Sequence, residues 1–134
     1  MLGPVSDRGG DELRPVVARS TCGQLDPSTV RFTQDSAGST FSDGRSVLDL
    51  ANDMARAGKA PAGLPPIRVF EQNGELYSLD IRRLFAGQYS GARLPYRMAT
   101  SSEIAARNQT QILDGTSIMI RFPGGRGNWV WWQQ

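Results

Sequence analysis

Apolar and polar residues alternate along several short segments of the chain, a pattern typical of strands that are buried on one face. The segments that show it lie at 30–33, 67–70, 75–79, 94–98, 117–122 and 128–132. Asn73-Gly74 separates two of them and is a strong signal for a two-residue turn, so these two strands are expected to form a hairpin.

Three other segments have the spacing of amphipathic helices. The first begins at Ser46 and ends at Gly58, the second covers 81–90, and the third, at 102–107, follows a capping-box pattern. The order of strands and helices predicts a small α+β domain with one mixed β-sheet and about three helices.

Residues 1–28 lack apolar periodicity and contain several Gly and Pro residues, so we expect a flexible linker there and a single domain at 29–134. The first residues have no apolar core of a classical signal peptide, and no apolar run has the roughly 18 residues that span a membrane. The sequence therefore predicts a monomeric domain with no membrane partner.

The composition limits the kinds of catalytic and metal site that this chain can form. Cys22 is the only cysteine and there is no histidine, which excludes disulfide frameworks, histidine metal sites and histidine-based triads. Of the 15 Lys and Arg residues only Lys59 is a lysine. Arginine binds phosphate through two parallel hydrogen bonds, although the codon usage of a GC-rich genome would also explain this bias.

The segment 64–98 has a Pro-Pro-Ile strand, a turn, a second strand and then Asp80-Ile81-Arg82-Arg83 at the start of a helix. This order resembles the ParB/sulfiredoxin-like superfamily, whose motif at that point is Gly-Glu-Arg-Arg or Gly-Cys-His-Arg. Ile81 stands where sulfiredoxins have the catalytic cysteine, so sulfinic-acid reduction is not expected. The absence of the glycine and glutamate also puts ParB-type nucleotide hydrolysis in doubt.

Together with residues 31–46, this segment resembles toxin domains at the C-termini of bacterial polymorphic toxins. The resemblance implies delivery by a contact-dependent, Rhs-like or type VI system, action in the cytoplasm of a target bacterium, and neutralisation by an immunity protein.

The first candidate site is the helix start at Asp80. Arg82 and Arg83 fall in the first helical turn, where free N–H groups favour an anion and where cations are otherwise disfavoured. A bound phosphate would explain the two arginines. The alternative is that one arginine pairs with Asp80 while the other is solvated.

The second candidate site is the polar loop before the first helix. If strand 30–33 lies beside strand 75–79, this loop opens at the same edge as Asp80. The carboxylates Asp35, Asp43 and Asp80 could then hold a divalent metal such as Mg²⁺. The expected substrate-binding residues are Gln34, Asp35, Ser36, Arg45 and Ser46. The alternative is that these residues only form turns and caps.

The C-terminal segment is a third candidate. Trp129, Trp131 and Trp132 lie near Arg126 and could stack bases or contact an immunity protein, but packing of one strand face into the core is the favoured interpretation. Ser117 and Asn128 are weak site candidates.

These observations favour an antibacterial nuclease that cleaves DNA, or less readily RNA, with Arg82 and Arg83 on the phosphate and Asp80 and Asp43 on a metal or water. Two alternatives stay open. One is an enzyme directed at ATP, CTP or NAD, and the other is a non-catalytic nucleic-acid-binding module.

Overall fold

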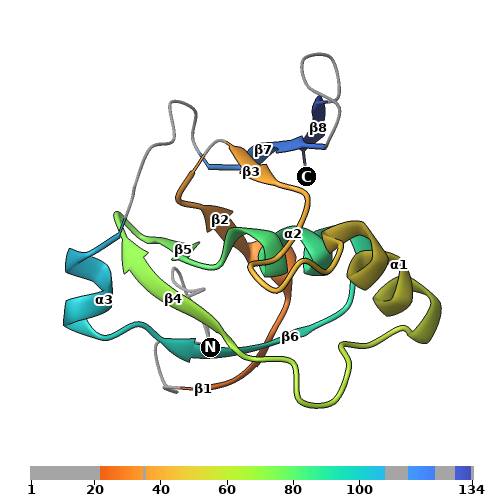
Figure 1. The fold of residues 1–134 in the computed structure, drawn as a ribbon. Helices are drawn as coiled ribbons and strands as arrows, with labels where there is room; N and C mark the ends of the chain where they lie inside the picture. The colour runs from red at the N-terminus through yellow and green to blue at the C-terminus, as the bar shows by residue number, and fades with distance from the viewer. Residues whose placement is uncertain (1–21, 35, 108–114, 123–128, 134) are drawn as a thin grey trace, which may run out of the picture.

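The computed structural model describes residues 22–34, 36–107, 115–122 and 129–133. Within these ranges the α+β prediction with three α-helices is confirmed (Figure 1). The helices are α1 (Val47–Ala57), α2 (Ile81–Ser90) and α3 (Ser101–Ala105), with a 3-10 turn at Pro27–Thr29. The strands are β1 (Cys22–Leu25), β2 (Val30–Phe32), β3 (Ser36–Gly38), β4 (Ile67–Gln72), β5 (Glu75–Ser78), β6 (Leu94–Met98), β7 (Ser117–Arg121) and β8 (Trp129–Gln133).

The described strands form two sheets instead of the single sheet that was predicted. One has five strands in the order β1-β6-β4-β5-β2, and the other has three in the order β3-β7-β8. The second sheet exists because β3 pairs in parallel with β7. The segment Ser36–Gly38 is short and has no β-branched or aromatic residue, so its sequence does not indicate a strand. We therefore expected it to be part of a loop.

Strand β1 is a second departure, because it lies within the range that the sequence assigned to a linker. It pairs antiparallel with β6 at the edge of the five-stranded sheet, and only Leu25 at its end is buried. Because only one residue of this strand is buried, its sequence lacks the alternation of apolar and polar residues by which strands are predicted. The folded part of the chain therefore begins before residue 29.

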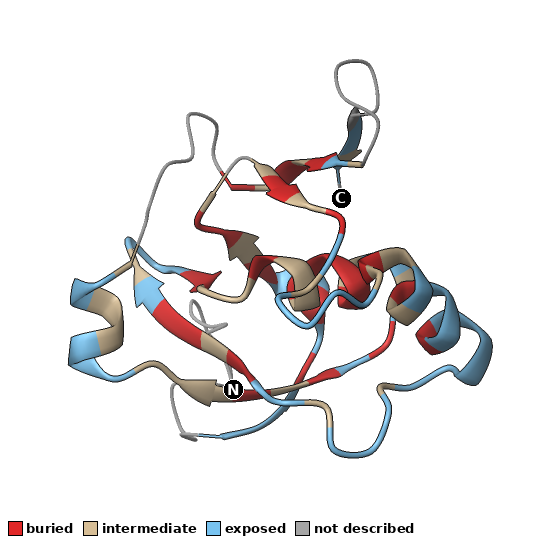
Figure 2. Cartoon of the chain, in the orientation of Figure 1, coloured by how far each residue is buried: buried red, intermediate tan, exposed pale blue. Residues whose placement is uncertain are grey.

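Helix α2 lies at the centre of the molecule, between the three-stranded sheet and strands β4 and β6, and α1 packs beside it (Figure 1). Burial follows this arrangement, since the buried residues concentrate on α2, on the inner side of α1 and along the central strands (Figure 2). Gly87 permits the close approach of α2 to β6, because a Cβ there would come within 2.5 Å of Leu94 Cδ1. The core thus holds the start of α2 in a fixed place.

Several local predictions are confirmed. The Ser46 hydroxyl accepts a hydrogen bond from the Asp49 N–H and caps α1, and Gly58 ends that helix in the left-handed conformation. Asn73 and Gly74 both have positive φ angles in the β4–β5 turn. Helix α3 has the complete capping box that was expected.

None of the helices in the described ranges has the length and apolar character needed to cross a membrane.

Candidate functional site

The expected meeting of two chain segments is confirmed at the carboxyl ends of β2 and β5. These strands pair in parallel, with Phe32 opposite Ser78. Just beyond them the Thr33 hydroxyl donates to the Ser78 carbonyl over 3.0 Å, and the Ser78 hydroxyl accepts from the Asp80 N–H over 2.9 Å. The start of α2 is thereby anchored to the segment that follows β2.

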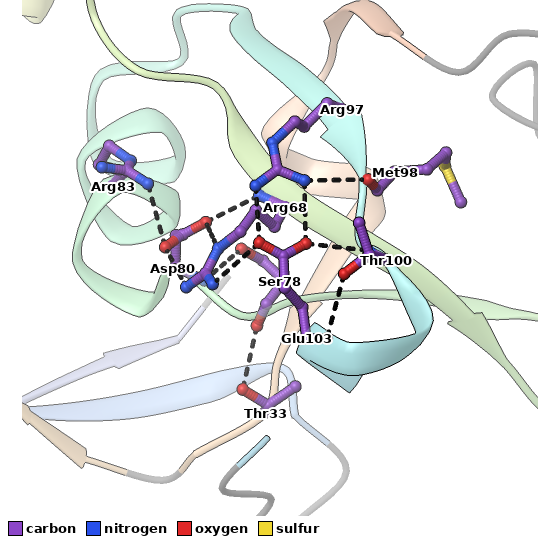
Figure 3. Close-up of polar contacts among 9 residues, drawn as sticks. All are labelled: Thr33, Arg68, Ser78, Asp80, Arg83, Arg97, Met98, Thr100 and Glu103. Carbon is purple, nitrogen blue, oxygen red and sulfur yellow. Dashed lines mark hydrogen bonds and ion pairs between the residues drawn. The ribbon is translucent and has the colours of Figure 1, made fainter. Parts of the chain in front are cut away.

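Asp80 lies at the N-cap of α2 but does not cap the helix with its side chain. Its carboxylate accepts hydrogen bonds from the Arg68 backbone N–H at 2.7 Å, from Nε at 3.0 Å and from Nη2 at 2.9 Å, and it also pairs with Arg83 Nη2 at 3.0 Å (Figure 3). Burial raises the pKa of Asp80, but the bonds from Arg68 and the charges of both arginines outweigh it and lower the pKa overall. Asp80 is therefore a charged acceptor at neutral pH that fixes two guanidinium groups.

The ionic cluster continues through residues that the sequence analysis did not assign to a site. Arg68 on β4 lies opposite Arg97 on β6 in the sheet register, which places two like charges side by side. Glu103 of α3 accepts from Arg97 Nη1 at 2.9 Å and from Nη2 at 2.7 Å, and lies 3.6 Å from Arg68 Nη1 (Figure 3). These hydrogen bonds, with that from the Thr100 N–H, hold the pKa of Glu103 far below its ordinary range. The two carboxylates thus compensate the two arginines of the sheet.

The sequence contained a partial signal for this cluster. Arg68 and Arg97 are polar residues in strands with alternating apolar and polar positions, and Glu103 belongs to the capping-box pattern of the third predicted helix. Their proximity depends on the parallel pairing of β4 with β6. That pairing joins strands that are separated by a hairpin and a helix, and no local pattern predicts it.

The two arginines of the helix start have different environments. Arg83 pairs with Asp80, as the structural alternative expected, while its Nε is buried without a hydrogen-bond partner among the described residues. Arg82 is partly exposed, and its Nε donates to the Gly38 carbonyl of β3 over 3.2 Å. Arg82 therefore ties α2 to the three-stranded sheet, whereas Arg83 has a buried donor that no described group satisfies.

Arg83 lines a hollow of about 670 Å³, here called the Arg83 hollow. Its other walls are residues 41–46, the first turns of α1 and residues 61–65. The hollow brings three predicted site residues, Asp43, Arg45 and Ser46, together with Arg83. Asp43 Oδ2 accepts from Arg45 Nε over 2.9 Å, and hydrogen bonds from the Arg45 backbone and side chain lower the pKa of Asp43.

Two predicted residues of the loop, Gln34 and Ser36, are not part of this hollow. Gln34 lines a separate hollow of about 340 Å³ that also contains Arg68 and Arg107, here called the Gln34 hollow. The Ser36 hydroxyl accepts a hydrogen bond from Arg121 Nη1 over 2.6 Å, across the three-stranded sheet. Asp35 lies outside the described residues.

The expected metal ligands Asp43 and Asp80 lie in different surroundings, and Asp43, unlike Asp80, lines the Arg83 hollow. Both oxygens of Asp80 accept from arginine, so positive charge already occupies the positions that a metal would take. The part of the chain that the structure describes contains no cluster of three or more His, Cys, Asp or Glu residues placed to hold a metal ion. The divalent metal therefore stays a prediction.

The C-terminal strand places its described tryptophans in two environments. The Trp132 indole N–H donates to Gln88 Oε1 over 2.8 Å, and its ring meets Phe85 edge-on at 5.7 Å between centroids. Trp131 is 56% exposed. The favoured interpretation, that one face of this strand packs into the core, is confirmed for Trp132.

Ser117, a weak site candidate, is a buried strand residue. Arg126, Asn128 and the side chain of Trp129 lie outside the described part of the structure.

Comparisons of the chain with protein-family models, with curated proteins and with solved structures find no match. The resemblance to the ParB/sulfiredoxin-like superfamily therefore stays a prediction.

Proposed function

We propose that this chain is an antibacterial toxin domain of ParB/sulfiredoxin-like type that cleaves phosphodiester bonds in DNA, with RNA as the less favoured substrate. In this proposal the scissile phosphate binds in the Arg83 hollow. A specialised secretion system delivers the domain to the target cytoplasm, and an immunity protein neutralises it.

The observation that carries the proposal is the state of Arg83. Its guanidinium is fixed on one side by Asp80, and its side chain, which is 21% exposed, lines the hollow. A phosphate offers several acceptor oxygens to an arginine in this position, with charge-assisted hydrogen bonds that are stronger than neutral ones.

The other residues then have distinct roles. Asp80 orients Arg83 and does not contact the substrate, because Arg68 and Arg83 use both of its oxygens. Asp43 lies on the wall of the hollow and is half exposed, so it is the carboxylate that can orient or activate a water molecule. Arg45 and the Ser46 end of α1 provide further positive potential for the phosphate.

One observation favours a second function, an enzyme directed at single nucleotides such as ATP, CTP or NAD. The wall of the Arg83 hollow carries Asp43, Asp49 and Asp53 together with Arg45 and Arg83, which is a mixed charge and not a basic groove. A nucleic-acid strand would pass these carboxylates at each phosphate. A single nucleotide would need only the arginine side of the hollow, whose volume is in the range of small-ligand sites.

The test is expression of the wild type, Arg83→Ala and Arg83→Lys in bacteria, followed by examination of chromosomal DNA, RNA and nucleotide pools. Arg83→Ala should lower cleavage at least about a hundredfold, and lysine should restore only part of it because a point charge lacks the planar fork of arginine. Arg93→Ala changes an exposed arginine outside both hollows, so it is the matched control and should keep full activity. Full toxicity of Arg83→Ala would disprove the assignment.

A salt titration separates the two functions. Binding of DNA should weaken steeply with salt, since each neutralised phosphate releases counterions, whereas binding of one nucleotide should change much less.

A further inference from the structure

The Gln34 hollow lies next to the proposed phosphate site and has no role in it. Its walls come from the segment after β2, the end of β5 and helix α3. Leu79 and Ala106 are the apolar members of the lining, and hydrogen-bonding groups come from Thr33, Gln34, Arg68, Ser102, Glu103 and Arg107. A hollow that sets convergent polar groups beside an apolar surface can bind a flat organic ligand with hydrogen-bonding edges.

Arg107 provides a fixed planar surface in this hollow. Its guanidinium carbon lies 5.3 Å from the centre of the Phe70 ring, and its Nη1 donates to the Ile104 carbonyl over 2.7 Å. Guanidinium planes that are held in this way stack on nucleobases. The stacking surface and the apolar walls at Leu79 and Ala106 would enclose a flat ring.

Gln34 provides the group that reads the edge of such a ring. Its side chain is partly exposed, and no hydrogen bond of its carboxamide is found among the residues that the structure describes. A carboxamide offers one acceptor and two donor hydrogens, which match the paired donor and acceptor groups on base edges.

The two hollows are linked by a shared ion pair. Asp80 Oδ1 is 2.9 Å from Nη2 of Arg68, which lines the Gln34 hollow, and 3.0 Å from Nη2 of Arg83, which lines the Arg83 hollow. Both guanidinium groups therefore meet at one oxygen atom. A ligand that occupied both hollows would place a phosphate beside Arg83 and a neighbouring group beside Gln34.

We propose that the Gln34 hollow binds a nucleobase of the substrate, which stacks on Arg107 and forms hydrogen bonds to the Gln34 carboxamide. This inference rests on the proposed function, since it assigns the second half of the same substrate. It predicts that the protein recognises a base and not only a sugar-phosphate backbone.

The test uses deoxyadenosine, deoxycytidine, deoxyguanosine and thymidine, with 2-deoxyribose 5-phosphate as the ligand that lacks a base. Each is titrated into ¹⁵N-labelled full chain while the side-chain amide signals of Gln34, assigned from Gln34→Ala, are followed by NMR. At least one deoxynucleoside should shift these signals and the sugar phosphate should not. Gln34→Ala should weaken that binding about tenfold or more, the discrimination expected for a paired amide contact.

Matched variants keep the result interpretable. Gln24→Ala changes an exposed glutamine of β1 outside both hollows and should bind the deoxynucleosides like the wild type. Gln34→Glu keeps the shape of the side chain but removes the amide donors, so it should change which base binds best. Circular dichroism checks that each variant folds.

The two proposals fail separately, because deoxynucleoside binding is measured without turnover. The nucleobase inference is overturned if no deoxynucleoside shifts the Gln34 signals, or if the sugar phosphate shifts them equally, even when Arg83→Ala abolishes cleavage. If deoxynucleosides bind as expected while Arg83→Ala cleaves normally, the base site stands and the phosphate assignment falls.

Discussion

Asp43 and Asp80 are two aspartates that pair with arginine at neighbouring parts of the molecule, and the two pairs differ in almost every physical respect. Asp43 pairs with Arg45 two residues away, and the side chain of Arg45 is 83% exposed. Asp80 pairs with Arg68 twelve residues away on another element, and its own side chain is only 13% exposed.

The difference shows that one residue type can serve two purposes at one site. An exposed pair is screened by water and contributes little to folding, so Asp43 is free to act on a ligand. A largely buried carboxylate must stay paired, since removal of one partner leaves an uncompensated charge. Asp80 therefore supports Arg68 and Arg83, and in the proposed function Asp43 is the carboxylate that acts on water.

The largest expected effect distinguishes these two roles. Asp80→Asn should lower the free energy of unfolding by about 3 kcal/mol, because Arg68 and Arg83 lose their common negative partner. Asp43→Asn should leave the unfolding midpoint unchanged while it lowers cleavage. Urea unfolding and activity assays on both variants measure this. If Asp80→Asn and Asp43→Asn lowered the free energy of unfolding equally, the two aspartates would contribute alike to stability and this distinction would be wrong.

A smaller effect is expected at the helix that borders the exposed pair. Ser46→Ala removes the hydroxyl that caps α1 and should cost about 1 kcal/mol, more than loss of the adjacent Asp43 charge. The comparison of thermal melts for Ser46→Ala and Ser46→Asp measures it, since aspartate is also a good cap. A melt of Ser46→Ala identical to the wild type would mean that the loop is held by its backbone contacts alone.

The smallest expected effect concerns acid. The pKa of Asp80 in the folded state lies below its ordinary value of 3.8, so its ion pairs stabilise the fold above that pH and are lost as pH falls through the folded pKa. The wild type should therefore lose stability as pH falls below about 4. Asp80→Asn should show a shallower decline in urea melts taken between pH 5 and pH 2. If the wild type and Asp80→Asn lost stability equally with falling pH, Asp80 would not contribute to the acid dependence.

Much of the local structure could be predicted because its causes are local. The cap at Ser46, the Asn73-Gly74 turn and the capping box at Thr100 each depend on residues within four positions of one another. The pairing of β2 with β5, which the sequence analysis stated only as the condition for the two candidate segments to meet, is observed.

The site itself was only partly predictable, because its contacts depend on strand order. Asp43, Arg45 and Arg83 do line one hollow, as the motif analysis expected. The Arg68 contact that defines the role of Asp80 needs the register of β4 against β5 and β6, and Gln34 was separated from the other predicted residues by the same geometry. Sequence spacing predicts contacts only between residues within one or two turns of each other, so it does not predict side chains that a sheet brings together.

The three-stranded sheet has a consequence for the order in which the molecule is assembled. Strand β3 pairs with β7, and the Ser36–Arg121 contact closes a loop of 85 residues. Contacts between residues so far apart in sequence are expected to form late, because the chain loses conformational entropy before these contacts can stabilise it. The Gly38 carbonyl that holds Arg82 therefore reaches its place only when β7 has joined. Synthesis or refolding would complete the neighbourhood of α2 last, so a nascent chain that ends before residue 121 should lack a finished site.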